Sequence, residues 1–337
     1  MLRVAASLVV VTVVLGCSST PSGSSGGGTG GSGGGSVSSG GGASSGGGSA
    51  SGGGSAAVDG GLTEAQRTIL AARPYRVVVP RSYDGGTASP VVVLLHGYGA
   101  TGINQDLYFG LTATAESKGF ILATPDGKVN KVNAHYWNAT DACCDYEGTG
   151  VDDVAYVGAI IDDLADRYRV DPRRVYLVGH SNGGFMSHRY ACEHAEKIAG
   201  IASLAGANWK DMAKCQPSQP LAVLQIHGTQ DSLINYDGGT IQNPFTFQTA
   251  GDYPSARDSV AVFAKRFGCA ASLTSSGGAL DIDKAVTGAE TTREAFAGCA
   301  DGGVAELWTM TGGSHIPTLD TTFGPLVWGF LSAHPKP

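Results

Sequence analysis

The stretch "YLVGHSNGGF" (residues 176–185) joins an apolar run to a helix-like segment through a glycine-rich turn. Its centre, "GHSNG" at residues 179–183, fits the pattern G-x-S-x-G, in which a strand ends, the chain turns sharply and a helix begins. Such a tight turn leaves no room for a Cβ beside the serine, and it projects the hydroxyl from the edge of the sheet. The context therefore favours Ser181 as a nucleophile over a serine in an ordinary turn.

Apolar runs alternate with helix-like stretches on both sides of this turn. This alternation predicts an α/β fold with a mostly parallel sheet and helices on both faces. The expected strands are 75–79, 90–95, 119–124, 174–178, 198–205, 221–226 and 304–310. The expected helices are 104–118, 152–168, 182–192, 254–267 and 323–333.

A serine hydroxyl is a weak nucleophile, so it needs a base that is itself oriented by an acid. After an elbow of this kind the acid comes next along the chain and the histidine comes last. Asp231 directly follows the strand-like run at 221–226, and parallel sheets place functional side chains at strand ends. Asp237 and Asp252 are weaker candidates because neither follows a strand directly.

The predicted base is His315, which lies in the loop "TGGSHIP" (residues 311–317) after the last expected strand. Three other histidines lie too near the elbow helix to act as the base: His180, His188 and His194. His227 is interpreted as structural and His334 as a surface residue. The oxyanion also needs backbone donors. We expect them to be the N–H of Asn182 and the N–H of Tyr98, with Gly97 as the alternative to Tyr98.

The N-terminal part of the chain reads as an export signal. Residues 1–17 have one early arginine, an apolar run too short for a comfortable membrane span, and "LGC" ending at Cys17. This pattern is similar to a bacterial lipobox, in which Cys17 is acylated, and an ordinary cleaved signal peptide is the alternative. Residues 18–60 are almost entirely Gly and Ser and predict a disordered tether, which leaves 61–337 as the catalytic domain.

Six cysteines remain beyond Cys17, an even number that suggests disulfides in an exported protein. Proximity along the chain favours two pairs and leaves two neighbours to bridge each other or pair elsewhere. The favoured pairs are Cys192–Cys215 and Cys269–Cys299, and the neighbours are Cys143 and Cys144. No Cys/His cluster has zinc spacing, so we expect no metal and no cofactor.

Further stretches point to a family: "LLHGYGA", "YWNATDACC", "VDDVAYVGAIIDDL", "RVYLVGHSNGGFM", "LQIHGTQDSLINYDGG" and "GGSHIP". With these the chain resembles exported α/β-hydrolases of the polyhydroxybutyrate depolymerase-like and feruloyl esterase-like groups, near carbohydrate esterase family 1. The resemblance implies an α/β-hydrolase fold, with Ser181, Asp231 and His315 as the triad. It also implies that Trp137 lines the cleft. Tyr98, Tyr136 and Trp137 are candidates to stack on a ring or a sugar, and a packing role is the alternative.

One position departs from the family. Its polymer depolymerases and feruloyl esterases usually have Trp directly after the catalytic histidine, and Ile316 stands there in this chain. The expected substrate is therefore a soluble carboxylic ester, such as an acetyl or feruloyl ester of plant polysaccharide or a hydroxyalkanoate ester. Attack on a solid polyester is the alternative.

Two alternative functions fit the same residues: a peptidase or amidase that uses the same triad, and an inactive hydrolase that serves as a surface binding module. The composition, with 15% charged residues and a net charge of −7, argues against a nucleic-acid partner. The expected location is outside the cytoplasm, either secreted or on the cell surface, with membrane contact only through a lipid at Cys17.

Overall fold

The computed structural model describes residues 61–243 and 245–337. The predictions of a signal peptide, of acylation at Cys17 and of a tether over 18–60 lie outside the described residues. Within the described part, no helix is long and apolar enough to cross a membrane.

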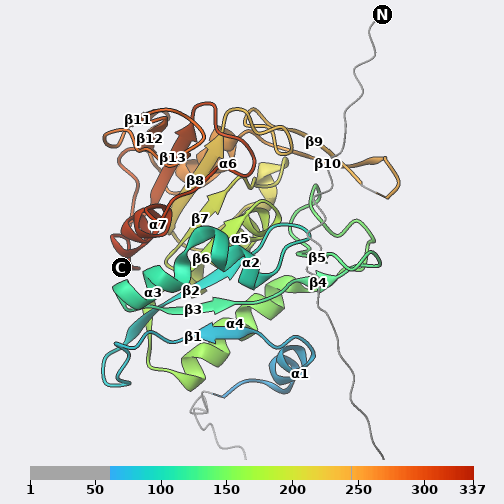
Figure 1. Cartoon of the computed structure of the whole chain (residues 1–337), viewed down its shortest axis with the longest axis vertical. Coiled ribbons are helices and arrows are strands. Elements are labelled where there is room, and N and C mark those ends of the chain that lie inside the picture. Colours follow the sequence, from blue (N-terminus) through green and yellow to red (C-terminus); the bar gives the residue numbers. More distant parts are fainter. Residues whose placement is uncertain (1–60, 244) are drawn as a thin grey trace, which may run out of the picture. The chain divides into compact units, whose positions relative to one another are not determined.

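A large twisted sheet runs through the described part of the chain, and it confirms the predicted α/β class (Figure 1). Its nine strands lie in the order β1 (Arg76–Val78), β3 (Ile121–Thr124), β2 (Ser89–Leu95), β6 (Val170–His180), β7 (Gly200–Leu204), β8 (Ala222–Gly228), β13 (Val304–Met310), β12 (Thr291–Phe296) and β11 (Leu273–Ser275). Neighbours from β3 to β13 are parallel, whereas β1, β12 and β11 add antiparallel edges. The carboxyl ends of the parallel strands therefore meet at one edge of the sheet.

Helices cover both faces of this sheet because its central strands are apolar on both sides. In β2, Val91 and Val93 pack in the same core cluster as residues of α4 (Asp153–Arg167) and α5 (Asn182–Glu193). Val92 and Leu94 pack instead with residues of α3 (Leu111–Lys118) and α7 (Phe323–Ser332). Continuous apolar strands buried on both faces are typical of parallel sheets.

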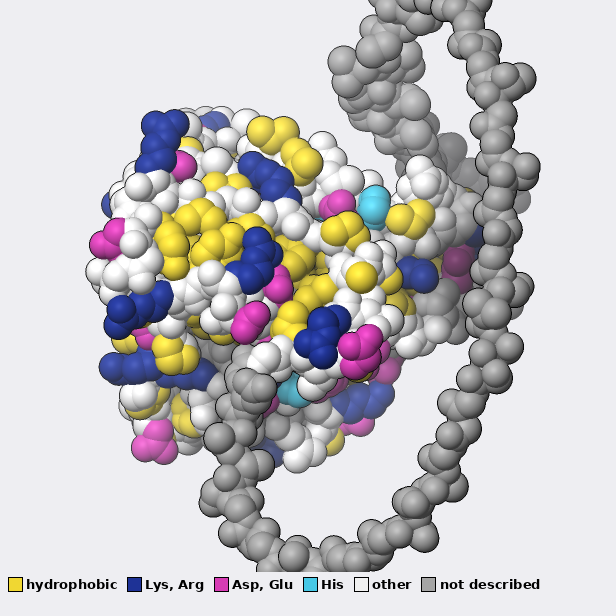
Figure 2. All heavy atoms as spheres, turned by 90° about the horizontal axis from the view of Figure 1, so that it is seen from below, with side chains coloured by type: hydrophobic (Ala, Val, Ile, Leu, Met, Phe, Trp, Pro, Cys, Tyr) yellow, Lys and Arg dark blue, Asp and Glu magenta, His cyan; other side chains and the backbone are white. Residues whose placement is uncertain are grey.

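The remaining elements lie around this core. They are α1 (Glu64–Ala72), α2 (Gly102–Phe109), α6 (Ala256–Arg266), the hairpin of β9 (Gly239–Gln242) and β10 (Thr249–Tyr253), the pair of β4 (Lys128–Val129) and β5 (His135–Tyr136), and short 3₁₀ turns at Ala195–Lys197 and Met212–Lys214. Charged side chains of both signs are interspersed on the face of the molecule seen in Figure 2.

The structure corrects one predicted helix. The segment 104–118 is not continuous but forms α2 and α3, separated by Gly110 in the left-handed conformation at φ 65°. Asp106 stabilises the break, because its carboxylate accepts hydrogen bonds from the backbone N–H and the hydroxyl of Thr112. Glycine is the residue that adopts this conformation without strain.

Three disulfides tie the described part of the chain together: Cys192–Cys215, Cys269–Cys299 and the neighbours Cys143–Cys144. The first two are the pairs that proximity along the chain favours, and the third is the vicinal alternative. Cys269–Cys299 joins the end of α6 to the loop after β12 across 30 residues.

Replacing this pair in Cys269→Ser/Cys299→Ser is expected to lower the free energy of unfolding by about 3–4 kcal/mol, because the bridge restricts the unfolded chain over a loop of this length. Urea unfolding of the variant and of the wild type without reductant measures the difference. An unchanged midpoint would contradict a stabilising role for this bridge.

Candidate active site

The turn between β6 and α5 holds Ser181 in a conformation that few residues adopt. Its φ of 52° and ψ of −118° place it outside both the strand and the helix, and its N–H donates to the carbonyl of Leu204 at 2.8 Å. A Cβ on Gly179 would lie 2.2 Å from the carbonyl oxygen of Gly183, and one on Gly183 would lie 2.1 Å from that of Leu95. Both glycines of the motif are therefore required by the close approach of backbone to backbone.

The structure brings Ser181, His315 and Asp231 together from three separate parts of the chain. The Nε2 atom of His315 lies 3.0 Å from Ser181 Oγ, and its Nδ1 atom lies 2.8 Å from Asp231 Oδ2. Asp231 follows β8 and His315 follows β13, so both lie beyond the carboxyl ends of parallel strands, like Ser181 after β6. The arrangement permits proton transfer from the serine hydroxyl to the imidazole.

Asp231 is held as a carboxylate. It is buried, and burial alone would raise its pKa, but hydrogen bonds from His227 and His315 outweigh burial and hold the pKa well below its usual range. Its Oδ1 atom accepts the backbone N–H groups of Leu233 at 2.9 Å and Ile234 at 2.8 Å. A carboxylate acts only as an acceptor, so His315 carries its proton on Nδ1 and leaves Nε2 free to accept from Ser181.

His180, the second residue of the motif, has a role that the sequence did not indicate. Burial, with His315 nearby, lowers its pKa to about 4, so the ring is neutral. Its Nε2 atom lies 3.0 Å from the backbone carbonyl oxygen of His315 and donates to it. This bond attaches the loop that carries His315 directly to the elbow.

A pocket of about 360 Å³ opens beside Ser181. It is lined by Gly97, Tyr98, Ala100, Asn104, Gln105, Tyr108, His180, Ser181, Leu233, His315 and Ile316. Leu233 and Ile316 are 64% and 62% exposed, which gives the pocket an apolar rim beside the serine. Ile316 therefore lies in the same pocket as Ser181 and His315.

Two of the residues expected to contact substrate do not lie in this pocket. Trp137 and Tyr136 are 0% and 1% exposed, so both are packing residues, and the expectation that Trp137 lines the cleft is wrong. Trp137 packs inward because its indole N–H donates to the carbonyl of His96 at 3.0 Å, and its ring stacks on Tyr156 with the centroids 6.4 Å apart. The position of an aromatic residue next to a motif does not reveal which way its ring points.

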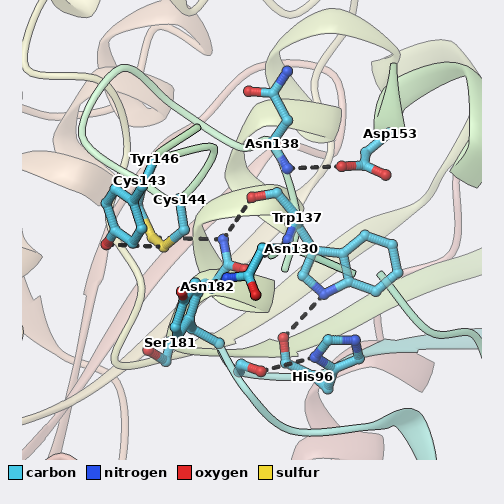
Figure 3. The surroundings of a disulfide bond; sticks show 12 residues. His96, Asn130, Trp137, Asn138, Cys143, Cys144, Tyr146, Asp153, Ser181 and Asn182 are labelled. Carbon is cyan, nitrogen blue, oxygen red and sulfur yellow. Dashed lines mark hydrogen bonds between the residues drawn. A yellow bond between two sulfur atoms is a disulfide. The ribbon is translucent and has the colours of Figure 1, made fainter. Parts of the chain in front are cut away.

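The side chain of Asn182 ties the elbow to the segment of the vicinal disulfide (Figure 3). Its Oδ1 accepts the backbone N–H of Trp137 at 2.7 Å, and its Nδ2 donates to the carbonyl of Trp137 at 2.9 Å. The same Nδ2 lies 3.5 Å from Cys143 Sγ. The sequence suggested only a backbone role for Asn182, since no pattern indicates a partner 45 residues earlier.

A second pocket, of about 840 Å³, lies around this segment. Polar and charged side chains dominate its lining, which includes Asn138, Thr140, Asp141, Asp145, Tyr146, Arg189, Glu193, Lys214 and Asn243. Tyr146 packs edge to face against Tyr98 of the serine pocket, with ring centroids 5.5 Å apart. In the described residues, no group of three or more His, Cys, Asp or Glu side chains is placed to hold a metal ion.

The sheet, the strained elbow and the order of the three residues define an α/β-hydrolase fold. The chain belongs to the Phospholipase/Carboxylesterase family, whose model matches residues 83–252, about half of the chain.

Two curated relatives and one solved structure illustrate the similarity. NocK of Nocardia uniformis subsp. tsuyamanensis, a presumptive esterase, is 34% identical over 179 residues, which are 52% of this chain and 51% of that protein. Feruloyl esterase B of Piromyces equi is 30% identical over 200 residues, which are 57% of this chain and 35% of that protein. The chain thus spans about half or less of the length of these relatives.

The solved structure of an acetyl xylan esterase from Aspergillus awamori superposes on this chain with a TM-score of 0.52 at 15% sequence identity. The match covers 76% of this chain and 92% of that one. At this identity the likeness shows the fold.

The close approach at the elbow can be tested with Gly183→Ala. Because the new methyl group would meet the backbone of β2, we expect the free energy of unfolding to fall by about 1–3 kcal/mol or more, together with a loss of Ser181 reactivity. Thermal unfolding and labelling by a fluorophosphonate measure the two effects.

The matched control is Gly329→Ala in α7, where a Cβ would meet nothing within 4 Å. It is expected to be neutral or stabilising by up to about 1 kcal/mol. Equal behaviour of the two variants would contradict the steric argument.

Proposed function

We propose that this protein is an exported serine hydrolase that cleaves carboxylic esters through an acyl-enzyme. The observation that carries the proposal is the hydrogen-bonded chain from Ser181 through His315 to Asp231, which opens into the 360 Å³ pocket. Membership of the Phospholipase/Carboxylesterase family supports the same class of reaction.

The geometry suggests each step. Ser181 Oγ attacks the ester carbonyl carbon while His315 Nε2 takes its proton, and Asp231 stabilises the imidazolium that forms. His315 then gives this proton to the departing alkoxide, which leaves as the alcohol. Water attacks the acyl-enzyme with His315 again as base, and releases the carboxylic acid and free Ser181.

The developing oxyanion requires donors close to Ser181 Oγ. The N–H of Asn182 lies at the first position of α5, where no intrahelical acceptor is in reach. Tyr98 is preferred over Gly97 as the second donor, because the N–H of Gly97 already donates to Gln105 Oε1 at 3.2 Å.

The His96 ring orients the peptide that carries the Tyr98 donor. Its Nε2 accepts from the N–H of Gly127, so its Nδ1 carries the proton and donates to the carbonyl of Gly97 at 2.8 Å. In a trans peptide the following N–H, that of Tyr98, points the opposite way from this carbonyl. A Cβ on Gly97 would lie 3.5 Å from the Cβ of Ser181, which brings this peptide close to the nucleophile.

The substrate class we favour is an acetyl or feruloyl ester of a plant polysaccharide. An apolar pocket suits the acyl group, and the neighbouring polar pocket of about 840 Å³ suits a sugar alcohol. The relatives' names, feruloyl esterase and acetyl xylan esterase, support esters of this kind and give the polyester alternative no support. Hydroxyalkanoate esters and amide analogues are the comparison substrates in a test.

Export remains part of the proposal. Three disulfides in the described residues fit an oxidising compartment. Acylation of Cys17 can be tested by metabolic labelling with a fatty-acid probe in the wild type and in Cys17→Ala.

The central test is Ser181→Ala with p-nitrophenyl acetate and a fluorophosphonate probe. Without the attacking oxygen we expect kcat to fall by a factor of about 10⁴ or more, with unchanged thermal unfolding and no covalent labelling. Full turnover by this variant would contradict the serine mechanism. Absence of both turnover and labelling in the wild type would favour a binding module, and preference for an amide over the ester of one acid would favour a peptidase.

Ile316 is expected to contribute to acyl selectivity because it forms the rim of the pocket. Ile316→Ala should raise KM about threefold to tenfold for a feruloyl ester and change little for an acetyl ester, since only the larger acyl group reaches the rim. Val132→Ala, also at an exposed residue but outside the pocket lining, is the control. Equal KM changes for both esters would contradict this role.

A further inference from the structure

A chain of buried polar side chains runs from His188 through Gln225 to His227, beside Asp231. His188, Gln225 and His227 are each at most 1% exposed. Gln225 Oε1 lies 2.7 Å from His188 Nε2, and Gln225 Nε2 lies 3.1 Å from His227 Nδ1 and 2.9 Å from the carbonyl oxygen of Gly206. The sequence assigned none of these residues to the site.

The carbonyl of Gly206, which contacts Gln225, fixes the direction of the hydrogen bonds in this chain. The Gly206 carbonyl only accepts, so the Gln225 group that faces it is the NH₂, and the amide oxygen faces His188. Burial lowers the pKa of His188 to about 4, so this ring is neutral and donates through Nε2. His227 Nδ1 also faces the Gln225 NH₂ and must accept, which leaves the His227 proton on Nε2.

The Nε2–H of His227 donates to the carbonyl of Ile234 and lies beside the Asp231 carboxylate. His227 Nε2 lies 2.7 Å from the carbonyl oxygen of Ile234 and 3.3 Å from Asp231 Oδ2. Oδ2 is the oxygen that also receives His315 Nδ1, while Oδ1 receives two backbone N–H groups. Two imidazoles and two peptide groups therefore surround one carboxylate, and only one of these donors belongs to the triad.

We propose that His227 is a positioning residue: a neutral imidazole, held in its Nε2–H form by Gln225, that orients the Asp231 carboxylate toward His315 and shares its Oδ2 atom. The proposal deepens the serine mechanism and rests on it. His227 does not touch the substrate or the reacting atoms, and it acts only through Asp231.

Because His227 and His315 share the Oδ2 atom of Asp231, His227 influences the base His315. With fewer donors, Asp231 would hold the protonated form of His315 more strongly, so His315 would remain charged, and unable to accept from Ser181, up to a higher pH. The other titratable groups that face this region are His180, Tyr236 and Tyr253. None of them is altered in the His227 variants.

The test compares three replacements of His227 under pH-dependent turnover of p-nitrophenyl acetate and pH-dependent fluorophosphonate labelling. His227→Phe keeps a ring and removes both nitrogens. In His227→Asn the side-chain amide takes the position of Nδ1, so no donor remains at the position of Nε2. In His227→Gln the amide reaches the level of Nε2 and retains a donor to Asp231.

For His227→Phe and His227→Asn we expect the acid limb of kcat/KM to move up by about 0.5–1 pH unit. We also expect kcat to fall about 10- to 100-fold with little change in KM, because the carboxylate loses its orientation. His227→Gln should restore the acid limb to its wild-type position and recover most of kcat. His334→Gln, just after the C-terminal end of α7, is the control for replacing a histidine elsewhere.

An acid limb that stays in place in both donor-free variants would overturn the proposal. So would equal losses in all three variants, since this would show that His227 only fills space. If His227→Phe does not fold, as thermal unfolding would reveal, the comparison of Asn with Gln decides alone. Failure of the serine mechanism looks different, because wild-type protein would then show no Ser181-dependent turnover or labelling.

Discussion

The structure depends on the absence of side chains where helix α5 meets the sheet. Gly183 approaches the Leu95 carbonyl, and Gly184 and Gly206 face each other so closely that a Cβ on either would lie about 2.5 Å from its neighbours. This approach lets α5 begin directly at the edge of β2 and β6, and Ser181 at the turn between β6 and α5 has a positive φ of 52°. The pocket, the orientation of the serine hydroxyl and the first free N–H of α5 follow from this contact.

Hydrogen bonds between side chains and backbone groups of three loops hold the site together. His180 fixes the loop of His315 by donating to the His315 carbonyl, and His227 Nε2 lies 3.3 Å from Asp231 Oδ2. Both histidines stand within strands that end at the site, so the strands carry the supporting groups as well as the reactive ones. A site supported in this way needs little rearrangement when a substrate enters, which is the condition for electrostatic stabilisation of a transition state.

The sequence predicted where the parallel strands lie along the chain, and it singled out Ser181, Asp231 and His315, which the structure brings together. Both depend on local patterns: apolar runs, a tight glycine turn, and polar residues directly after strands. It missed the antiparallel strands β11 and β12, whose residues are partly exposed and lack a continuous apolar run. It also missed the inward turn of Trp137 and the buried chain at Gln225, since these depend on partners 41 and 37 residues away. Long-range contacts of this kind have no local signature.

The bond between His180 and the His315 carbonyl joins residues 135 positions apart. It can form only when β13, the strand that precedes His315, is paired with β8, so the geometry of the site depends on contacts between distant segments. Without this pairing, the glycine-rich turn lacks the imidazole that lies 3.0 Å from Ser181 Oγ. On the proposed mechanism, the reactivity of Ser181 and the completion of the sheet therefore depend on the same contacts.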